Sequence, residues 1–115
     1  MTLPYFFFED LKEHGSLPPN GILSRTLHVD DKIKVLQFCF APGTELSAHT
    51  APVPALLYFV SGEAELQLGE DRKDVREGAF AWMAPRLEHA IRARTEVVML
   101  LVMLRDAPKA WRPRA

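Results

Sequence analysis

The chain has 115 residues, of which 48% are hydrophobic and 25% charged, and its 14 Lys and Arg against 15 Asp and Glu give a formal net charge of −1. This composition is typical of one soluble globular domain, and a single cysteine, Cys39, excludes an intramolecular disulfide. Balanced charge and the absence of an apolar run of about 20 residues argue against nucleic acid and membranes as partners.

The first 20 residues are interpreted as an N-terminal arm. The run Tyr5 to Phe8 is too aromatic to remain in water, which favours an edge strand that crosses to a second subunit, with packing on its own domain as the alternative. Residues 8–14 have a short helical pattern. The first ten residues lack the basic start of a secretion signal, so we expect a cytoplasmic protein.

From residue 25 onward the pattern is that of short strands and turns. Nine prolines interrupt the chain, and turn signals recur every 8 to 12 residues, which predicts an all-β sandwich or barrel with little helix. His28 is interpreted as a structural residue of an early strand, and His14 as an exposed one. The predicted later strands cover residues 33–40, 56–60, 64–68, 73–76, 79–83, 89–93 and 97–104, the last two forming a pair around residues 94–96.

Two of these segments resemble the two motifs of the cupin superfamily. In the first, Gly43, His49 and Gly62 stand at the family spacing; in the second, Gly78 and His89 do so. The resemblance, to a small single-domain cupin, implies a jelly-roll barrel, commonly dimeric, with its site inside the barrel. One domain over residues 1–115 is expected, with residues 105–115 as a solvated tail.

The departures from the motifs concern the metal ligands. A cupin with its full ligand set holds a divalent metal by three histidines and a carboxylate, but Ala51 stands at the second histidine and Ala55 at the glutamate. Arg86 replaces a glycine at the barrel mouth, where it could pair with a ligand carboxylate. Only His49 and His89 remain as metal candidates, for iron, copper, nickel or zinc completed by water or substrate. Glu45, in a turn, and Glu88 are interpreted as solvated acids.

Strand parity suggests which side chains line the barrel. Leu36, Phe38 and Phe40 are assigned to the lumen, while Val35, Gln37 and Cys39 face the other way. Loss of two ligands opens space for a small, partly apolar molecule. The candidate pocket residues are His49, His89, Leu36, Phe38, Ala51, Ala55, Leu57 and Met103.

The sequence supports three candidate functions. The first is a cupin that binds a small molecule, with His49 and His89 as polar anchors or partial metal ligands. The second is a mononuclear metal-dependent dioxygenase or isomerase. The third is a structural homodimer module with a vestigial site. A homodimer is expected in each case, and the sequence alone leaves the choice open.

Overall fold

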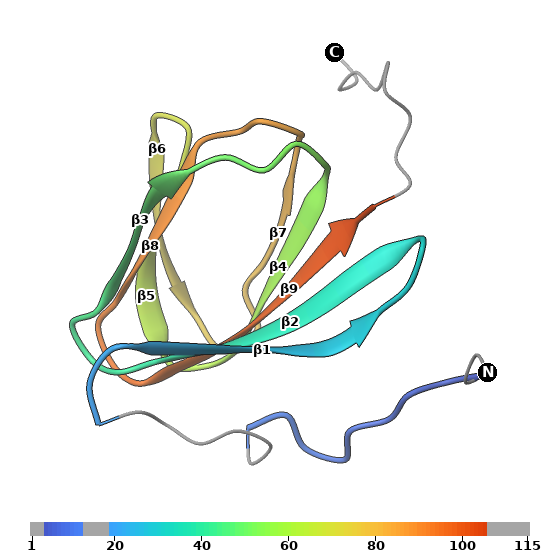
Figure 1. Ribbon diagram of the computed structural model, residues 1–115. Coiled ribbons are helices and arrows are strands. Elements are labelled where there is room, and N and C mark those ends of the chain that lie inside the picture. The colour runs from blue at the N-terminus through green and yellow to red at the C-terminus, as the bar shows by residue number, and fades with distance from the viewer. Residues whose placement is uncertain (1–3, 13–18, 106–115) are drawn as a thin grey trace.

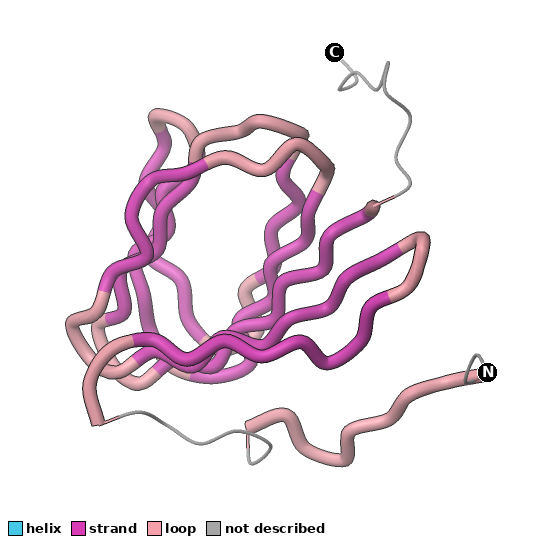
Figure 2. The backbone as a smooth tube through the Cα atoms, viewed as in Figure 1, coloured by secondary structure: helices cyan, strands magenta, loops and turns pink. Residues whose placement is uncertain are grey.

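Two antiparallel sheets face each other in the computed structural model, which describes residues 4–12 and 19–105 (Figure 1). Sheet A has the order β1 (Ile22–Val29), β2 (Ile33–Phe40), β9 (Val97–Leu104), β4 (Ala55–Ser61) and β7 (Phe80–Met83). Sheet B has the order β3 (Glu45–His49), β8 (His89–Ala93), β5 (Glu63–Leu68) and β6 (Asp71–Arg76). Strands form the barrel wall and loops gather at its ends, as Figure 2 shows. The all-β barrel expected from the sequence is confirmed.

The side chains of β2 alternate between the inner and the outer face of sheet A. Phe40 is fully buried in the core and Phe38 packs against it, while the intervening Cys39 lies on the opposite face of the sheet and is itself only 4% exposed. Side chains two apart in a strand share a face, so the assignment of Leu36, Phe38 and Phe40 to the interior agrees with this arrangement. The core lies between the sheets, where apolar side chains of both inner faces meet. Its members are Phe40, Ala55, Leu57, Phe59, Ala64, Leu66, Met83, Ile91, Ala93, Val97 and Met99.

The expected helix over residues 8–14 is wrong for the part that the structure describes. Residues 8–12 form no helix, and residues 13 and 14 lie outside the described chain. The Asp10 side chain accepts a hydrogen bond from the Lys12 backbone N–H at 2.9 Å. This local turn competes with helical bonding, which explains the error.

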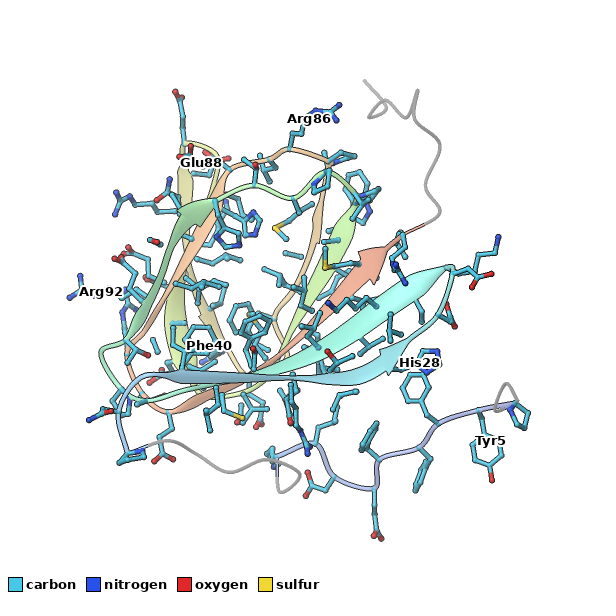
Figure 3. The ribbon with its side chains drawn as sticks, in the orientation of Figure 1. Tyr5, His28, Phe40, Arg86, Glu88 and Arg92 are labelled. Carbon is cyan, nitrogen blue, oxygen red and sulfur yellow. The ribbon has the colours of Figure 1, made fainter. Side chains whose placement is uncertain are left out.

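The aromatic arm forms no strand over residues 4–12 and lies against its own sheet A (Figure 3). The ring of Phe6 stacks on His28 with centroids 4.6 Å apart. Gln37, only 1% exposed, donates from Nε2 to the Leu11 carbonyl at 2.7 Å and accepts from Arg25 at 3.0 Å. These bonds satisfy a buried amide, and in place of the expected edge strand the arm is an irregular segment packed on its own barrel, while its crossing to a second subunit stays a prediction.

The expected pairing of residues 89–93 with 97–104 is also wrong. β8 lies in sheet B and β9 in sheet A, so the turn between them crosses from one sheet to the other. Two backbone bonds hold this crossing, because the Arg94 and Thr95 N–H groups both donate to the Glu63 carbonyl, at 2.9 and 3.3 Å. The expected β5–β6 hairpin, in contrast, is present, although β6 begins at Asp71, two residues before the predicted strand.

The far end of β9 stays bonded as far as residue 105. The Arg105 N–H donates to the Lys32 carbonyl at 2.7 Å, and its guanidinium donates to the Asp30 carbonyl at 2.6 Å. Residues 106–115 of the expected tail lie outside the described chain. Within residues 4–12 and 19–105 no helix is long and apolar enough to cross a membrane.

Candidate functional site

The two motif histidines stand opposite each other on neighbouring strands of sheet B. His49 ends β3, His89 begins β8, and the two are direct partners in the antiparallel register. Their ring centroids are 4.2 Å apart at an interplanar angle of 58°. His89 is 4% exposed, whereas His49 is exposed. The fold therefore brings both predicted histidines together at one end of the barrel.

A β-bulge in β3 allows His49 to lie next to His89. The register shifts between Leu46, which pairs with Ile91, and His49, which pairs with His89. Ser47 and Ala48 on β3 thus lie opposite the single residue Ala90 on β8. Without the extra residue, Leu46 and His49 would point to opposite faces; with it, Leu46 packs on the core and His49 still meets His89.

Backbone carbonyls determine which ring nitrogen of each histidine carries the proton. Nδ1 of His49 lies 2.8 Å from the Ser47 carbonyl, and Nδ1 of His89 lies 2.9 Å from the Leu87 carbonyl. A carbonyl oxygen only accepts, so Nδ1–H donates in both rings and the neutral form leaves Nε2 with a lone pair. Each histidine therefore presents Nε2 as an acceptor or a metal ligand.

The Nε2 atom of His89 is not fully buried, although the residue is only 4% exposed. Every fully buried side-chain nitrogen or oxygen in the described part of the chain has a hydrogen-bond partner. Nε2 of His89 has none among those residues, because the one hydrogen bond of this ring is made by Nδ1. It follows that Nε2 of His89 keeps some exposed surface.

The other predicted pocket residues lie on the inner face of sheet A or in the neighbouring loop. Ala55 and Leu57 are 2% and 1% exposed, and both belong to the core. Met103 is the register partner of Ala55, and Leu36 is the partner of Leu101, which packs on the core. Ala51 lies in the loop after β3. These placements are compatible with a pocket, but their contact with a ligand stays a prediction.

Met83 is a residue of the same region that the pocket prediction omitted. It ends β7, pairs with Ala55 and is 2% exposed. Its neighbour Trp82 points to the opposite face and is 44% exposed. The period of two along β7 could have identified Met83 from the sequence, since it shares a face with Ala81 and Ala79.

The remaining donors do not complete a metal site of the kind that the cupin motifs imply. Among residues 4–12 and 19–105 no three His, Cys, Asp or Glu side chains are placed to hold one ion. Glu45 opens β3, not a turn as expected, and is exposed beside Arg92 in the register. Glu88 is also exposed and points away from the barrel (Figure 3). The described residues therefore do not fit a metal held by three histidines and a carboxylate.

Arg86, weighed as a carboxylate partner at the mouth, points away from the barrel in Figure 3. It has a φ of 66°, the one positive value outside glycine in the described chain. Its N–H donates to the Ala51 carbonyl at 2.7 Å, which ties the two loops of the mouth together. The backbone N–H of Arg86, not its side chain, makes this contact.

We expect Arg86→Gly to stabilise the protein by about 0.5 to 1 kcal/mol. Left-handed backbone costs a non-glycine residue about 1–2 kcal/mol, and the greater freedom of glycine in the unfolded chain offsets part of the gain. Urea denaturation measures the difference. The neighbouring Glu88→Gly, at a residue without positive φ, is expected to destabilise the protein. A loss of stability in Arg86→Gly would show that the arginine side chain itself contributes.

A depressed pKa at His89 makes stability depend on pH. Burial lowers the pKa of His89 below 6.5, opposed by the bond to the Leu87 carbonyl and aided by His49. The unfolded state therefore binds more protons near pH 6, and the free energy of unfolding falls as pH drops below about 6.5. Asp30, whose pKa is lowered to about 2 chiefly by its bond to His28, keeps its charge in this range.

We expect His89→Gln to flatten this dependence. Denaturant titrations between pH 7.5 and 5.5 should show a clear loss of stability in the unmodified protein and a smaller loss in the variant. Equal slopes for the two proteins would contradict the assignment of the pH dependence to His89.

A separate surface depression of about 350 Å³ lies over sheet B and is lined by Gly43, Glu65, Arg92, Ala93 and Arg94. The Arg94 guanidinium bonds Asp74 at 2.6 Å and lies 3.7 Å from Glu65. The lining thus combines the charges of Arg92 and Arg94 with that of Glu65, which also bonds Arg72 at 3.2 Å.

Comparison with known proteins agrees with this architecture. A conserved protein of unknown function from Streptococcus pyogenes is 26% identical, with a TM-score of 0.80, and the match covers 92% of this chain and 93% of that one. A cupin superfamily protein from Desulfitobacterium hafniense is 24% identical, with a TM-score of 0.81 and coverages of 90% and 95%. An oxalate decarboxylase from Bacillus subtilis shares the fold at 19% identity, with a TM-score of 0.70 and coverages of 83% and 28%.

No curated protein matches the chain at a significant level. The family model of the cupin domain matches residues 36–104, which include both histidines and most of the two sheets. This match spans more than half of the chain, and the solved structures agree with it over nearly the whole length. The chain therefore belongs to the cupin superfamily.

Proposed function

We propose that this cupin binds a small, partly apolar molecule in its barrel, with His49 and His89 as polar anchors. The observation that carries the proposal is the pair itself, with centroids 4.2 Å apart and each Nδ1 held by a carbonyl. Both Nε2 atoms are thereby left as acceptors at the edge of an apolar interior. Pockets that combine apolar walls with a few oriented polar groups are typical of small-molecule sites.

The tautomer indicates the chemistry of the ligand. Two neutral imidazoles that each present a lone pair at Nε2 accept hydrogen bonds, so the complementary ligand donates them. Ala55, where a metal-ligating carboxylate would stand, adds apolar surface. A phenol or an alcohol with an apolar body matches this combination better than a sugar phosphate, which would require cationic donors.

Thermal stabilisation by a panel of phenols and aliphatic alcohols tests this proposal. A ligand present at 100 times its Kd should add about 2.7 kcal/mol of stability. His49→Ala with His89→Ala should abolish the stabilisation, whereas His28→Ala, which removes a histidine stacked on Phe6, should retain it. If no compound stabilises the unmodified protein, the proposal is wrong and a structural module is favoured.

A metal-dependent dioxygenase or isomerase is the second candidate. Cupins commonly bind metals, and metal-ligating histidines usually donate their other ring nitrogen to a carbonyl or carboxylate, as both histidines do here. Elemental analysis of tag-free protein after dialysis against trace divalent metals tests it. A metal content below about a tenth of an equivalent per chain would rule out this candidate, because a catalytic metal of this kind is expected at near-stoichiometric occupancy.

We also propose that the chain is a homodimer that associates through the outer face of sheet A. Tyr58, Phe80 and Trp82 share this face, since Tyr58 pairs with Phe80 and the adjacent Leu56 pairs with Trp82. We call these three residues the aromatic patch. The outer face of sheet B instead carries ion pairs, among them Arg72 with Glu65 at 3.2 Å.

The size of the aromatic patch supports a second copy of the chain as its partner. Phe80 is 64% exposed, Trp82 44% and Tyr58 41%. With about 150–250 Å² for each aromatic side chain, these fractions amount to about 300 Å² of apolar surface. A standard interface needs about 800 Å² from each partner, so three side chains would supply more than a third of it.

A further inference from the structure

The last inward-facing row of sheet A at the mouth of the barrel combines apolar side chains with one cation. The row consists of direct register partners on four neighbouring strands: Lys34, Met103, Ala55 and Met83. Direct partners in antiparallel strands point to the same face, and Ala55 and Met83 are both 2% exposed within the core. The side chain of Lys34 therefore leaves β2 on the inner face of the sheet.

The histidine pair lies at the same end of the facing sheet. His49 ends β3 and Ala55 begins β4, so one short loop joins the end of sheet B to the row in sheet A. A second loop joins β7 to His89, and a backbone hydrogen bond of 2.7 Å connects the two loops. Lys34 and the histidines thus belong to one end of the barrel, on opposite sheets.

Lys34 is a cation without an anionic partner in the described chain. Its side chain is half-buried, and within residues 4–12 and 19–105 its ammonium takes part in no hydrogen bond or ion pair. The next residue on the same face of β2 is Leu36, whose register partner Leu101 packs on the core. A charge beside apolar surface is poorly solvated, so an anion that enters the barrel would gain a strong, charge-assisted hydrogen bond there.

We propose that the ligand of the barrel carries a carboxylate as well as a hydroxyl, and that Lys34 binds the carboxylate while the histidine pair binds the hydroxyl. The proposal rests on the role proposed above for His49 and His89, and it adds the ligand class and a residue that determines specificity. Facing sheets lie about 10 Å apart, so the two polar groups must be separated by an apolar body of about that length. A hydroxyphenylalkanoic acid has this form.

Calorimetric titration with two matched phenols tests the proposal. The compounds are para-hydroxyphenylpropanoate and para-propylphenol, which share the ring, the hydroxyl and a chain of three carbons. Only the first carries a carboxylate. We expect the unmodified protein to bind the acid about ten-fold more tightly than para-propylphenol, because a hydrogen bond between charged groups is made in one complex only.

Variants of Lys34 separate its charge from its packing. Lys34→Met removes the charge and keeps most of the apolar stem, so it should weaken binding of the acid about ten-fold and leave binding of para-propylphenol unchanged. Lys34→Arg retains a cation and should retain the preference for the acid. The matched control is Lys12→Met, which changes the net charge equally at an exposed residue of the arm. It should bind both phenols like the unmodified protein.

Four results would overturn the proposal: binding of neither phenol, equal affinities of the unmodified protein for both, an equal loss of both affinities in Lys34→Met, or a preference for the acid that survives this substitution. The last three leave the role of the histidine pair intact, because para-propylphenol binds without a carboxylate. If His49→Ala with His89→Ala instead leaves binding of the acid unchanged while Lys34→Met weakens it, the histidine role alone is wrong. The two proposals can therefore fail independently.

Discussion

Replacing Phe80 by glutamate is expected to raise the dissociation constant of the proposed homodimer about a thousand-fold. An aromatic anchor at the centre of an interface contributes about 2 kcal/mol, and a symmetric dimer loses two of them, which gives about 4 kcal/mol. Phe80 is 64% exposed in the single chain, so the fold itself should tolerate the change. Sedimentation velocity over a range of protein concentrations measures the shift from dimer to monomer.

Tyr5→Glu is the matched control, because Tyr5 is an aromatic residue of the arm that is 75% exposed and whose ring points away from the barrel (Figure 3). It should leave the dimer intact if the aromatic patch is the interface. Dissociation by Tyr5→Glu with no effect of Phe80→Glu would return the interface to the arm, as the aromatic run of the sequence suggests. A monomeric unmodified protein at all concentrations would contradict the dimer itself.

Most strands could be predicted because each depends on a local pattern, but β3 (Glu45–His49), where the sequence suggested a turn, was not among them. Residues 33–40 alternate between an inner and an outer set and end at a Pro-Gly turn, and β2 spans those residues. The burial of the outer residues was harder to predict than the face on which they lie. Gln37 was expected to face away from the lumen, and it does, but its burial depends on Leu11, which is 26 residues away in the chain. Sequence patterns report which face a side chain takes, not which distant segment covers it.

Connections between elements were harder to predict than the elements. The short turn at residues 94–96 suggested a hairpin, yet it joins two sheets. Its geometry depends on the Glu63 carbonyl, a partner about 30 residues earlier in the chain. In the candidate site, too, the residues could be predicted but not the contact between them. Motif spacing identified His49 and His89, but their contact requires the β3 bulge, and a bulge leaves no reliable mark in the residue pattern.

The turn between β8 and β9 packs against Gly62, which explains why the motif requires glycine there. Gly62 has a φ of +91°, a region that favours glycine. A Cβ at this position would overlap the Glu96 carbonyl oxygen and lie 2.9 Å from Val97 Cα. Both neighbours are backbone atoms, so neither can move aside as a side chain would. The crossing between the two sheets therefore depends on the missing side chain.

Gly62→Ala is accordingly expected to destabilise the protein by about 3 kcal/mol, from overpacking and left-handed backbone strain together. This is a large part of the roughly 5–15 kcal/mol typical of a domain, and it is measurable by urea denaturation. Gly78→Ala separates the two effects, because Gly78 has a φ of +94° but a Cβ added there would meet no atom within 4 Å. It should lose only about 1–2 kcal/mol. Equal losses in the two variants would mean that the turn yields to the added methyl group, and that the close approach of residues 96 and 97 does not hold the sheets together.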